Sequence, residues 1–128
     1  MNAIRTGKFF ERLTKRRLQL VTTLEYLGKQ QKQVEENTDW LDQAAYESRV
    51  RLLDRLTEWS VAELSEIDRA LDRIKARTYG LCLACHRPIE SERLDAAPEA
   101  EYCKACQEVR EALQRPQPEA PRSATLRR

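Results

Sequence analysis

This chain of 128 residues is poor in glycine and in aromatic residues. It has only 3 glycines and 6% aromatic residues, whereas 34% of its residues are charged. Such a composition provides little material for a large globular core and predicts a helix-rich protein. A mean hydropathy of −0.74 agrees with this prediction. A chain of this length most simply forms one domain.

Several protein classes are excluded by what else is missing. The single histidine, the lack of a nucleophile–base set and the lack of a glycine-rich phosphate loop indicate that the protein is not an enzyme. No apolar stretch is long enough to span a membrane, and the basic N-terminal segment has no continuous apolar run, so we expect a soluble cytoplasmic protein. A formal net charge of +2 is too small to indicate nucleic-acid binding by bulk electrostatics.

Cysteine occurs at four positions only, as two Cys-x-x-Cys pairs: Cys82 with Cys85, and Cys103 with Cys106. Each pair can present two thiolates to one side of a metal, and zinc prefers four such ligands in a tetrahedron. The spacing is typical of a structural zinc site. Two disulfides are the alternative, but the rest of the chain has an intracellular character, and intracellular thiols stay reduced. We therefore predict one zinc ion per chain on these four cysteines, with the adjacent His86 as a bystander.

Two long segments carry residues at alternating steps of three and four, which is the pattern of a coiled coil. The first series is Phe10, Leu13, Arg17, Leu20, Leu24, Leu27, Gln31 and Val34. The second series is Val50, Leu53, Thr57, Ser60, Leu64, Ile67, Leu71 and Ile74. The break between them is short, so the two helices should be antiparallel. We predict a mainly α fold, with a coiled-coil hairpin over 1–78, a tip near 37–44 and a length on the order of 50 Å.

The C-terminal third should form a small module at the base of this rod. We expect Gly80 to end the second arm in a left-handed conformation, followed by a C4 zinc finger and a short C-terminal helix over 79–114. Between the cysteine pairs, prolines and small residues predict irregular backbone that the metal must hold. Residues 115–128, with three prolines and four arginines against one glutamate, predict a disordered tail.

The tip sequence contains Asp39 and Asp42, three residues apart. One interpretation is helix capping, with Asp39 as N-cap of the second arm and Asp42 at its third position. The other is functional: two carboxylates on a thin rod can reach into a narrow channel and meet magnesium or basic side chains. Trp40, a large apolar side chain that a two-helix rod cannot bury, favours the second interpretation. Both can hold together.

The motifs of the chain resemble the DksA/TraR-type zinc-finger regulators of bacterial RNA polymerase. The resemblance runs from the first arm to about Gln107 and is carried by the tip motif Asp39-x-x-Asp42-x-Ala44, by Tyr79-Gly80-Leu81-Cys82-Leu83-Ala84-Cys85, by Ile89, by Arg93-Leu94-Asp95-Ala96-Ala97-Pro98-Glu99-Ala100 and by Tyr102-Cys103-Lys104-Ala105-Cys106. It implies a protein that binds RNA polymerase directly, inserts its coiled coil into the secondary channel and modulates initiation. The implied tip residues are Asp39, Asp42 and Ala44.

The chain departs from this family in two places. Trp40 stands where a proline commonly follows the first tip aspartate. The best-known members also bind guanosine tetraphosphate through basic residues near the base, and the corresponding positions here are Glu66, Ala97 and Gln107. Because none of them is basic, we expect regulation without this nucleotide.

The same residues leave other functions open. A nucleic-acid-binding zinc ribbon, or a coiled-coil adaptor, is one alternative, but segment 82–106 has three basic and five acidic residues, which does not favour phosphate binding. A transcript-cleavage-type channel factor is another, which the tip acids alone do not separate from a regulator. We expect a monomer with no sequence-specific DNA binding and no membrane partner.

Overall fold

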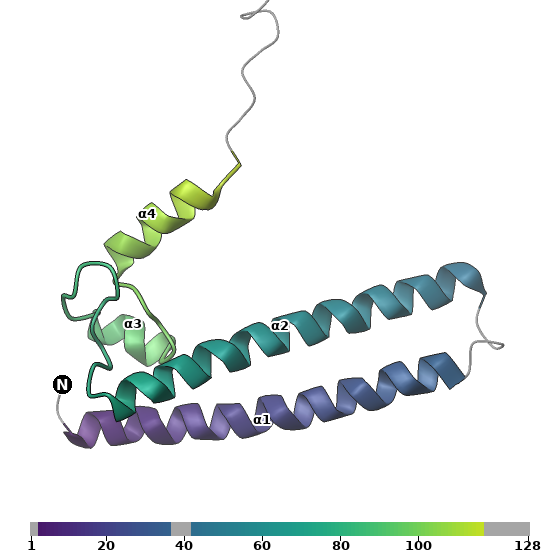
Figure 1. The fold of residues 1–128 in the computed structure, drawn as a ribbon, viewed down its shortest axis with the longest axis horizontal. Helices are drawn as coiled ribbons and strands as arrows, with labels where there is room; N and C mark the ends of the chain where they lie inside the picture. Colours follow the sequence, from purple (N-terminus) through teal and green to yellow (C-terminus); the bar gives the residue numbers. More distant parts are fainter. Residues whose placement is uncertain (1–2, 37–41, 117–128) are drawn as a thin grey trace, which may run out of the picture.

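The computed structural model describes residues 3–36 and 42–116, which contain four helices. Helices α1 (Ala3–Glu36) and α2 (Gln43–Lys75) lie antiparallel as a long rod (Figure 1). At one end of the rod lies α3 (Ser91–Ala96), and α4 (Lys104–Gln114) extends away from it. The predicted fold class is confirmed. Asp39, Trp40 and most of the predicted tail lie outside the described residues. Within the described ranges, no helix combines the length and apolar character that crossing a membrane requires.

The rod is held by the predicted heptad seam. The buried residues of α1 recur every seven positions: Leu13, Leu20, Leu27 and Val34. The facing seam of α2 has Leu53 and Ile67 buried, and Val50, Leu64, Leu71 and Ile74 partly buried. A repeat of seven residues keeps the apolar stripe of each helix facing its partner along the whole rod. With 34 residues in α1, the rod is about 50 Å long at ~1.5 Å per residue.

The seam prediction is wrong at its first position. Phe10 is 43% exposed, and the neighbouring Phe9 is buried instead, with only 3% exposed. The ring of Phe9 packs against the ring of Tyr79, with 5.6 Å between the centroids. Here α1 contacts the zinc module as well as α2, so its buried face is rotated by one residue relative to the regular heptad.

Helix α2 ends earlier than predicted, and glycine does not end it. Arg77 takes the left-handed conformation, with φ 62. Its N–H bonds to the carbonyl of Ile74 at 3.1 Å, and the N–H of Thr78 bonds to the carbonyl of Arg73 at 2.9 Å. This hydrogen-bond pair is a Schellman motif. Gly80 also has a positive φ of 87, but it starts the zinc loop.

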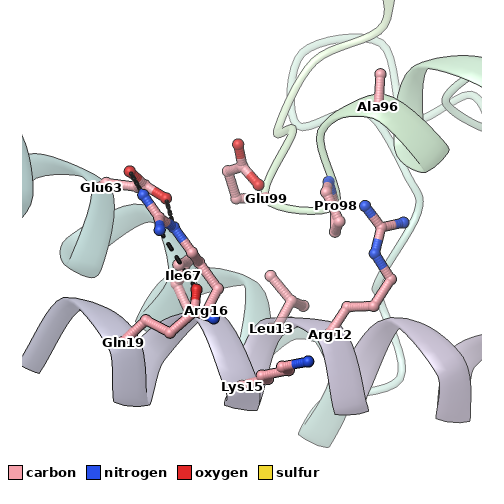
Figure 2. A pocket seen from close by; sticks show the side chains of 10 residues that line it. All are labelled: Arg12, Leu13, Lys15, Arg16, Gln19, Glu63, Ile67, Ala96, Pro98 and Glu99. Atoms are coloured by element: carbon pink, nitrogen blue, oxygen red, sulfur yellow. Dashed lines mark hydrogen bonds and ion pairs between the residues drawn. The ribbon is translucent and has the colours of Figure 1, made fainter.

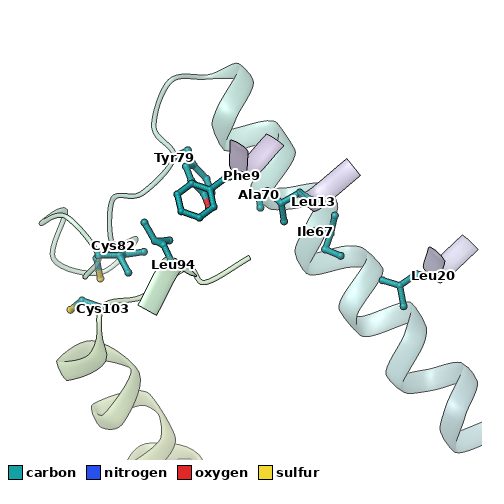
Figure 3. Packing of buried hydrophobic residues seen from close by; sticks show 10 residues of the cluster. Phe9, Leu13, Leu20, Ile67, Ala70, Tyr79, Cys82, Leu94 and Cys103 are labelled. Carbon is teal, nitrogen blue, oxygen red and sulfur yellow. The ribbon is translucent and has the colours of Figure 1, made fainter. Parts of the chain in front are cut away.

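The base has a hydrophobic core that the sequence analysis did not predict. Ile89 is buried and Leu94, on α3, is fully buried, so the segment between the cysteine pairs is neither wholly irregular nor without apolar contacts. Both belong to one cluster that joins the rod to the zinc module (Figure 3); its buried members are Phe9, Leu13, Leu20, Ile67, Ala70, Tyr79, Cys82, Ile89, Leu94 and Cys103.

Candidate metal centre and hairpin tip

The first cysteine pair is presented by a tight hairpin. Its ends are joined by an antiparallel bridge between Leu81 and Pro88. Inside it, the N–H of Cys82 bonds to the carbonyl of Arg87 at 2.8 Å, and the N–H of His86 bonds back to the carbonyl of Cys82 at 2.9 Å. His86 has φ 63, so it forms the turn. Among the described residues, the potential metal-binding group contains the four cysteines and not His86.

The second pair comes from the start of α4. Cys103 is the N-cap residue of this helix, and Cys106 lies in its first turn. The two cysteine loops are tied together by the N–H of Leu83, which bonds to the carbonyl of Glu101 at 2.9 Å. Figure 3 shows the sulfur atoms of Cys82 and Cys103 close to each other beside Leu94.

The geometry of the four sulfur atoms fits one zinc ion. All four Sγ atoms lie within 4.8 Å of one another, and all four cysteines are free thiols. Zinc–sulfur bonds of about 2.3 Å give a tetrahedron with edges of about 3.8 Å. The Sγ atoms of Cys85 and Cys103 are 3.8 Å apart. The chain therefore has a C4 zinc centre, as predicted, and not two disulfides.

The electrostatics of the cluster also favour a bound cation. Burial raises the pKa of Cys82, but hydrogen bonds from the backbone of Cys85, Cys103 and Ala84 outweigh it and lower this pKa to about 6. Hydrogen bonding to the Cys103 and Cys82 side chains raises the pKa of Cys106 to about 12. Four thiols at these distances cannot all ionise unless a positive ion replaces their protons, which zinc does. With four thiolate ligands, the zinc has no open position and is structural.

At the tip, Asp42 is the N-cap of α2. Its Oδ1 accepts a hydrogen bond from the N–H of Ala45 at 2.7 Å. The expected third position for Asp42 is wrong, because the helix begins at Gln43 and not one turn earlier. Asp42 and Ala44 are exposed, and Asp39 lies outside the described residues.

The three positions at which the family resemblance implies a nucleotide site come together at the base. They line one hollow of about 300 Å³: Glu66 lies on α2, Ala97 follows α3, and Gln107 lies on α4. The rest of its lining is Arg93, Glu99, Ala100, Glu101, Tyr102, Arg110 and Gln114. Burial, followed by the Glu99 carboxylate, raises the pKa of Glu66. The hollow thus contains three glutamates and two arginines.

The basic residues around this hollow already have partners. Arg93 donates to the carbonyl of Tyr102 at 2.8 Å, and the guanidinium of Arg110 lies 4.3 Å from the centroid of the Tyr102 ring. Outside the lining, Arg69 and Arg73 form ion pairs with Glu101, at 3.1 and 3.6 Å. This network was missed because its members are far apart in the sequence.

A second hollow, of about 410 Å³, lies between α1 and the segment 96–99 (Figure 2). Leu13 and Ile67 are apolar residues of its lining, and Arg16 donates to both carboxylate oxygens of Glu63, at 2.6 and 2.9 Å. The remaining residues are Arg12, Lys15, Gln19, Ala96, Pro98 and Glu99. The sequence analysis missed this hollow, although Arg12, Arg16 and Gln19 have the helical spacing that places them on one side of α1.

Comparisons with known proteins agree with this geometry. Residues 77–112 match the family model of the prokaryotic dksA/traR C4-type zinc finger. An uncharacterized protein of Aquifex aeolicus (strain VF5) is 37% identical over 97 residues, which are 76% of this chain and 65% of that protein. The RNA polymerase-binding transcription factor DksA of Caulobacter vibrioides is 34% identical over 85 residues, 66% of this chain and 60% of that protein. The chain thus spans less than two thirds of the length of these relatives.

Two solved structures have the same fold. Transcription factor DksA2 from Pseudomonas aeruginosa superposes with a TM-score of 0.81 and 28% identity, over 91% of this chain and 90% of that one. The RNA polymerase binding protein and transcriptional regulator Dks from Chlamydia trachomatis L2 (LGV434) gives a TM-score of 0.53 and 22% identity, over 91% and 99% of the two chains. At 22% identity, the similarity to the Chlamydia protein shows a shared fold and nothing more. The family resemblance predicted from the sequence is confirmed.

Proposed function

We propose that this chain is a transcription regulator that binds bacterial RNA polymerase directly, because its residues 77–112 match the dksA/traR C4-type zinc finger and its fold matches that of DksA2. The observation that carries the proposal is the likeness to DksA2 over nine tenths of both chains, rod and zinc module included. The name of the Caulobacter relative describes binding to the polymerase. A regulator is favoured over an enzyme, since a zinc ion with four thiolates has no position for substrate.

The proposed mode of action is insertion of the rod, tip first, into the secondary channel of the polymerase. A rod only two helices thick fits a narrow channel, and the zinc module at the other end is the broader part of the molecule (Figure 1). The exposed carboxylate of Asp42 lies at the far end of the rod. In this proposal Asp39, Asp42 and Ala44 act near the catalytic centre and alter the lifetime of promoter complexes.

We further propose that the regulator acts without guanosine tetraphosphate bound at the base. A nucleotide with several negative charges needs lysine or arginine side chains to replace its lost hydration. The hollow that contains Glu66, Ala97 and Gln107 offers three carboxylates instead. Its two arginines contact Tyr102, and the nearby Arg69 and Arg73 are paired with Glu101.

The first test is binding of the purified protein to purified RNA polymerase. The wild type should bind, and the double variant Asp39→Asn with Asp42→Asn should bind almost as well but no longer change the half-life of promoter complexes. Glu47→Gln is the matched control, because it removes an exposed carboxylate one turn further along α2. Absence of binding by the wild type, with zinc bound, contradicts the proposed function.

The second test is transcription in vitro from a responsive promoter with guanosine tetraphosphate titrated in. The polymerase should lack its own separate nucleotide site, so that only a shared site can respond. The effect of the protein should stay constant across the titration. A strong nucleotide-dependent increase shows that the base binds the nucleotide despite its acidic lining.

A further inference from the structure

One edge of the rod carries three large apolar side chains that the fold does not bury. Tyr26 on α1 is 60% exposed, and Leu52 and Trp59 on α2 are 54% and 63% exposed. Leu56, which is partly buried, packs beside them against the core of the rod. We call these four residues the rod-edge patch. Tyrosine and tryptophan side chains of this size gain most from being covered by a partner.

The four residues share one edge because two cross-links between the helices define it. Near the base, Arg16 bonds to Glu63 (Figure 2), and nearer the tip Arg49 donates to Gln30 at 3.3 Å. Each helix has a stripe of residues spaced by steps of three and four, which keeps the stripe on one side of that helix. The stripe of α2 is 49–52–56–59–63, and the stripe of α1 is 16–19–23–26–30. The patch therefore lies between the two cross-links.

The charges of the two edges differ. Along the two stripes of the patch edge the acidic residue is Glu63, which Arg16 neutralises, while Arg49 adds a cation. The opposite edge is marked by the pairs Arg17–Asp68 and Gln31–Asp54. On that edge the α2 stripe 54–58–61–65–68 carries three acidic residues. One edge of the rod is thus apolar and cationic, and the other is acidic.

We propose that the rod-edge patch is the surface through which the side of the rod contacts RNA polymerase, and that the polymerase surface it meets is apolar with carboxylates at its border. This inference rests on the proposed function and adds which side of the rod is engaged. Tryptophan, tyrosine and arginine are the residues that most often dominate binding energy at protein interfaces. A second copy of the chain is the alternative occupant, and sedimentation distinguishes it from the polymerase.

The test compares the affinity of purified RNA polymerase for the wild type and for variants of the full zinc-loaded chain. Trp59→Ala should raise the dissociation constant at least tenfold, and Tyr26→Ala with Trp59→Ala should raise it further. Leu18→Ala and Val61→Ala are the controls. These side chains are similarly exposed, at 67% and 50%, but they lie outside the two stripes that form the rod-edge patch. They should change the dissociation constant less than twofold. All four positions are exposed, so the thermal unfolding of each variant should match that of the wild type.

The outcomes separate this inference from the proposed function. If the wild type does not bind the polymerase, the proposed function fails and this inference fails with it. If the wild type binds and the patch variants bind equally well, only the rod-edge patch is overturned. A photo-crosslinking amino acid at position 59 should react with the polymerase, and one at position 61 should not; equal yields contradict the proposal. If the wild type sediments as a dimer and the Trp59→Ala variant sediments as a monomer, the patch binds a second copy of the chain. That result also overturns the proposal.

Discussion

Asp42 has two roles that two substitutions can separate. Its carboxylate caps α2 through the N–H of Ala45, at 2.7 Å, and in the proposed function the same carboxylate acts on the polymerase. Alanine removes both the cap and the charge. Asparagine removes the charge and keeps an oxygen that can accept the same hydrogen bond, because asparagine and aspartate are about equally good N-cap residues.

The expected stability changes follow from this contact. Asp42→Ala should cost about 1 kcal/mol, within a range of about 0.5–2 kcal/mol for N-cap residues. For a chain of this size that corresponds to about 3–6 °C in Tm. Asp42→Asn should change the stability by only a few tenths of a kcal/mol. Because the cap is at the end of the rod, part of the loss should appear as local fraying, with faster amide exchange in the first turn of α2.

The assays are thermal unfolding by circular dichroism, amide hydrogen exchange, and the half-life of promoter complexes. If the charge acts on the polymerase, both variants lose the regulatory effect while only Asp42→Ala loses stability. If Asp42→Asn regulates normally, the carboxylate is a cap and nothing more. If Asp42→Asn destabilises the rod as much as Asp42→Ala, the reasoning about the hydrogen bond to Ala45 is refuted.

Four further predictions concern the fold. Zinc chelation, or Cys103→Ser, should unfold the base while most of the helical circular dichroism remains, since α3 and α4 have 6 and 11 residues against 34 and 33 in the rod; loss of the whole signal contradicts this. Phe9→Ala should lower the free energy of unfolding by about 3–5 kcal/mol, and Phe10→Ala by clearly less, because Phe10 is partly exposed; similar losses in denaturant titrations argue against the observed packing. Gly28→Ala should stabilise the rod by about 0.5–1 kcal/mol, because an added Cβ meets no atom within 4 Å; a lower Tm refutes it. Arg77→Gly should stabilise by about 1 kcal/mol, since φ 62 is costly for a residue with a side chain; no gain in Tm refutes it.

The rod and the metal centre were predictable because their signals are periodic or fixed in spacing. Apolar residues that recur every seven positions leave a long helix no other way to bury them, so the pairing of α1 with α2 follows from the sequence. Two Cys-x-x-Cys pairs similarly indicate a zinc site wherever the connecting chain allows them to meet. In both cases one physical requirement selects a single arrangement.

The features that were missed depend on contacts between distant segments. Phe9 rather than Phe10 is buried because the zinc module, and not α2 alone, covers that end of α1. Helix α3 has six residues, too few for a periodic pattern to show. Arg77 ends α2 in a conformation that usually selects glycine, so the sequence has no marker for it. Near the tip, two aspartates were eligible as N-cap, and propensity alone does not choose between them.

The junction between base and rod decides the direction in which the rod extends from the zinc module. The shared core that contains Phe9, Leu94 and the zinc ligand Cys82 holds the two parts together, but hydrophobic contacts are not directional. Arg73 supplies the direction. Its buried guanidinium donates to the carbonyls of Glu99 and Ala100, at 3.4 and 3.3 Å, from within the last turn of α2. Because these carbonyls lie on the loop that leads into the second cysteine pair, the zinc centre and the axis of α2 are oriented by the same side chain. In the proposed function the rod enters a channel, and this entry needs such a fixed angle at the base, since a small rotation there displaces a tip about 50 Å away by many ångströms.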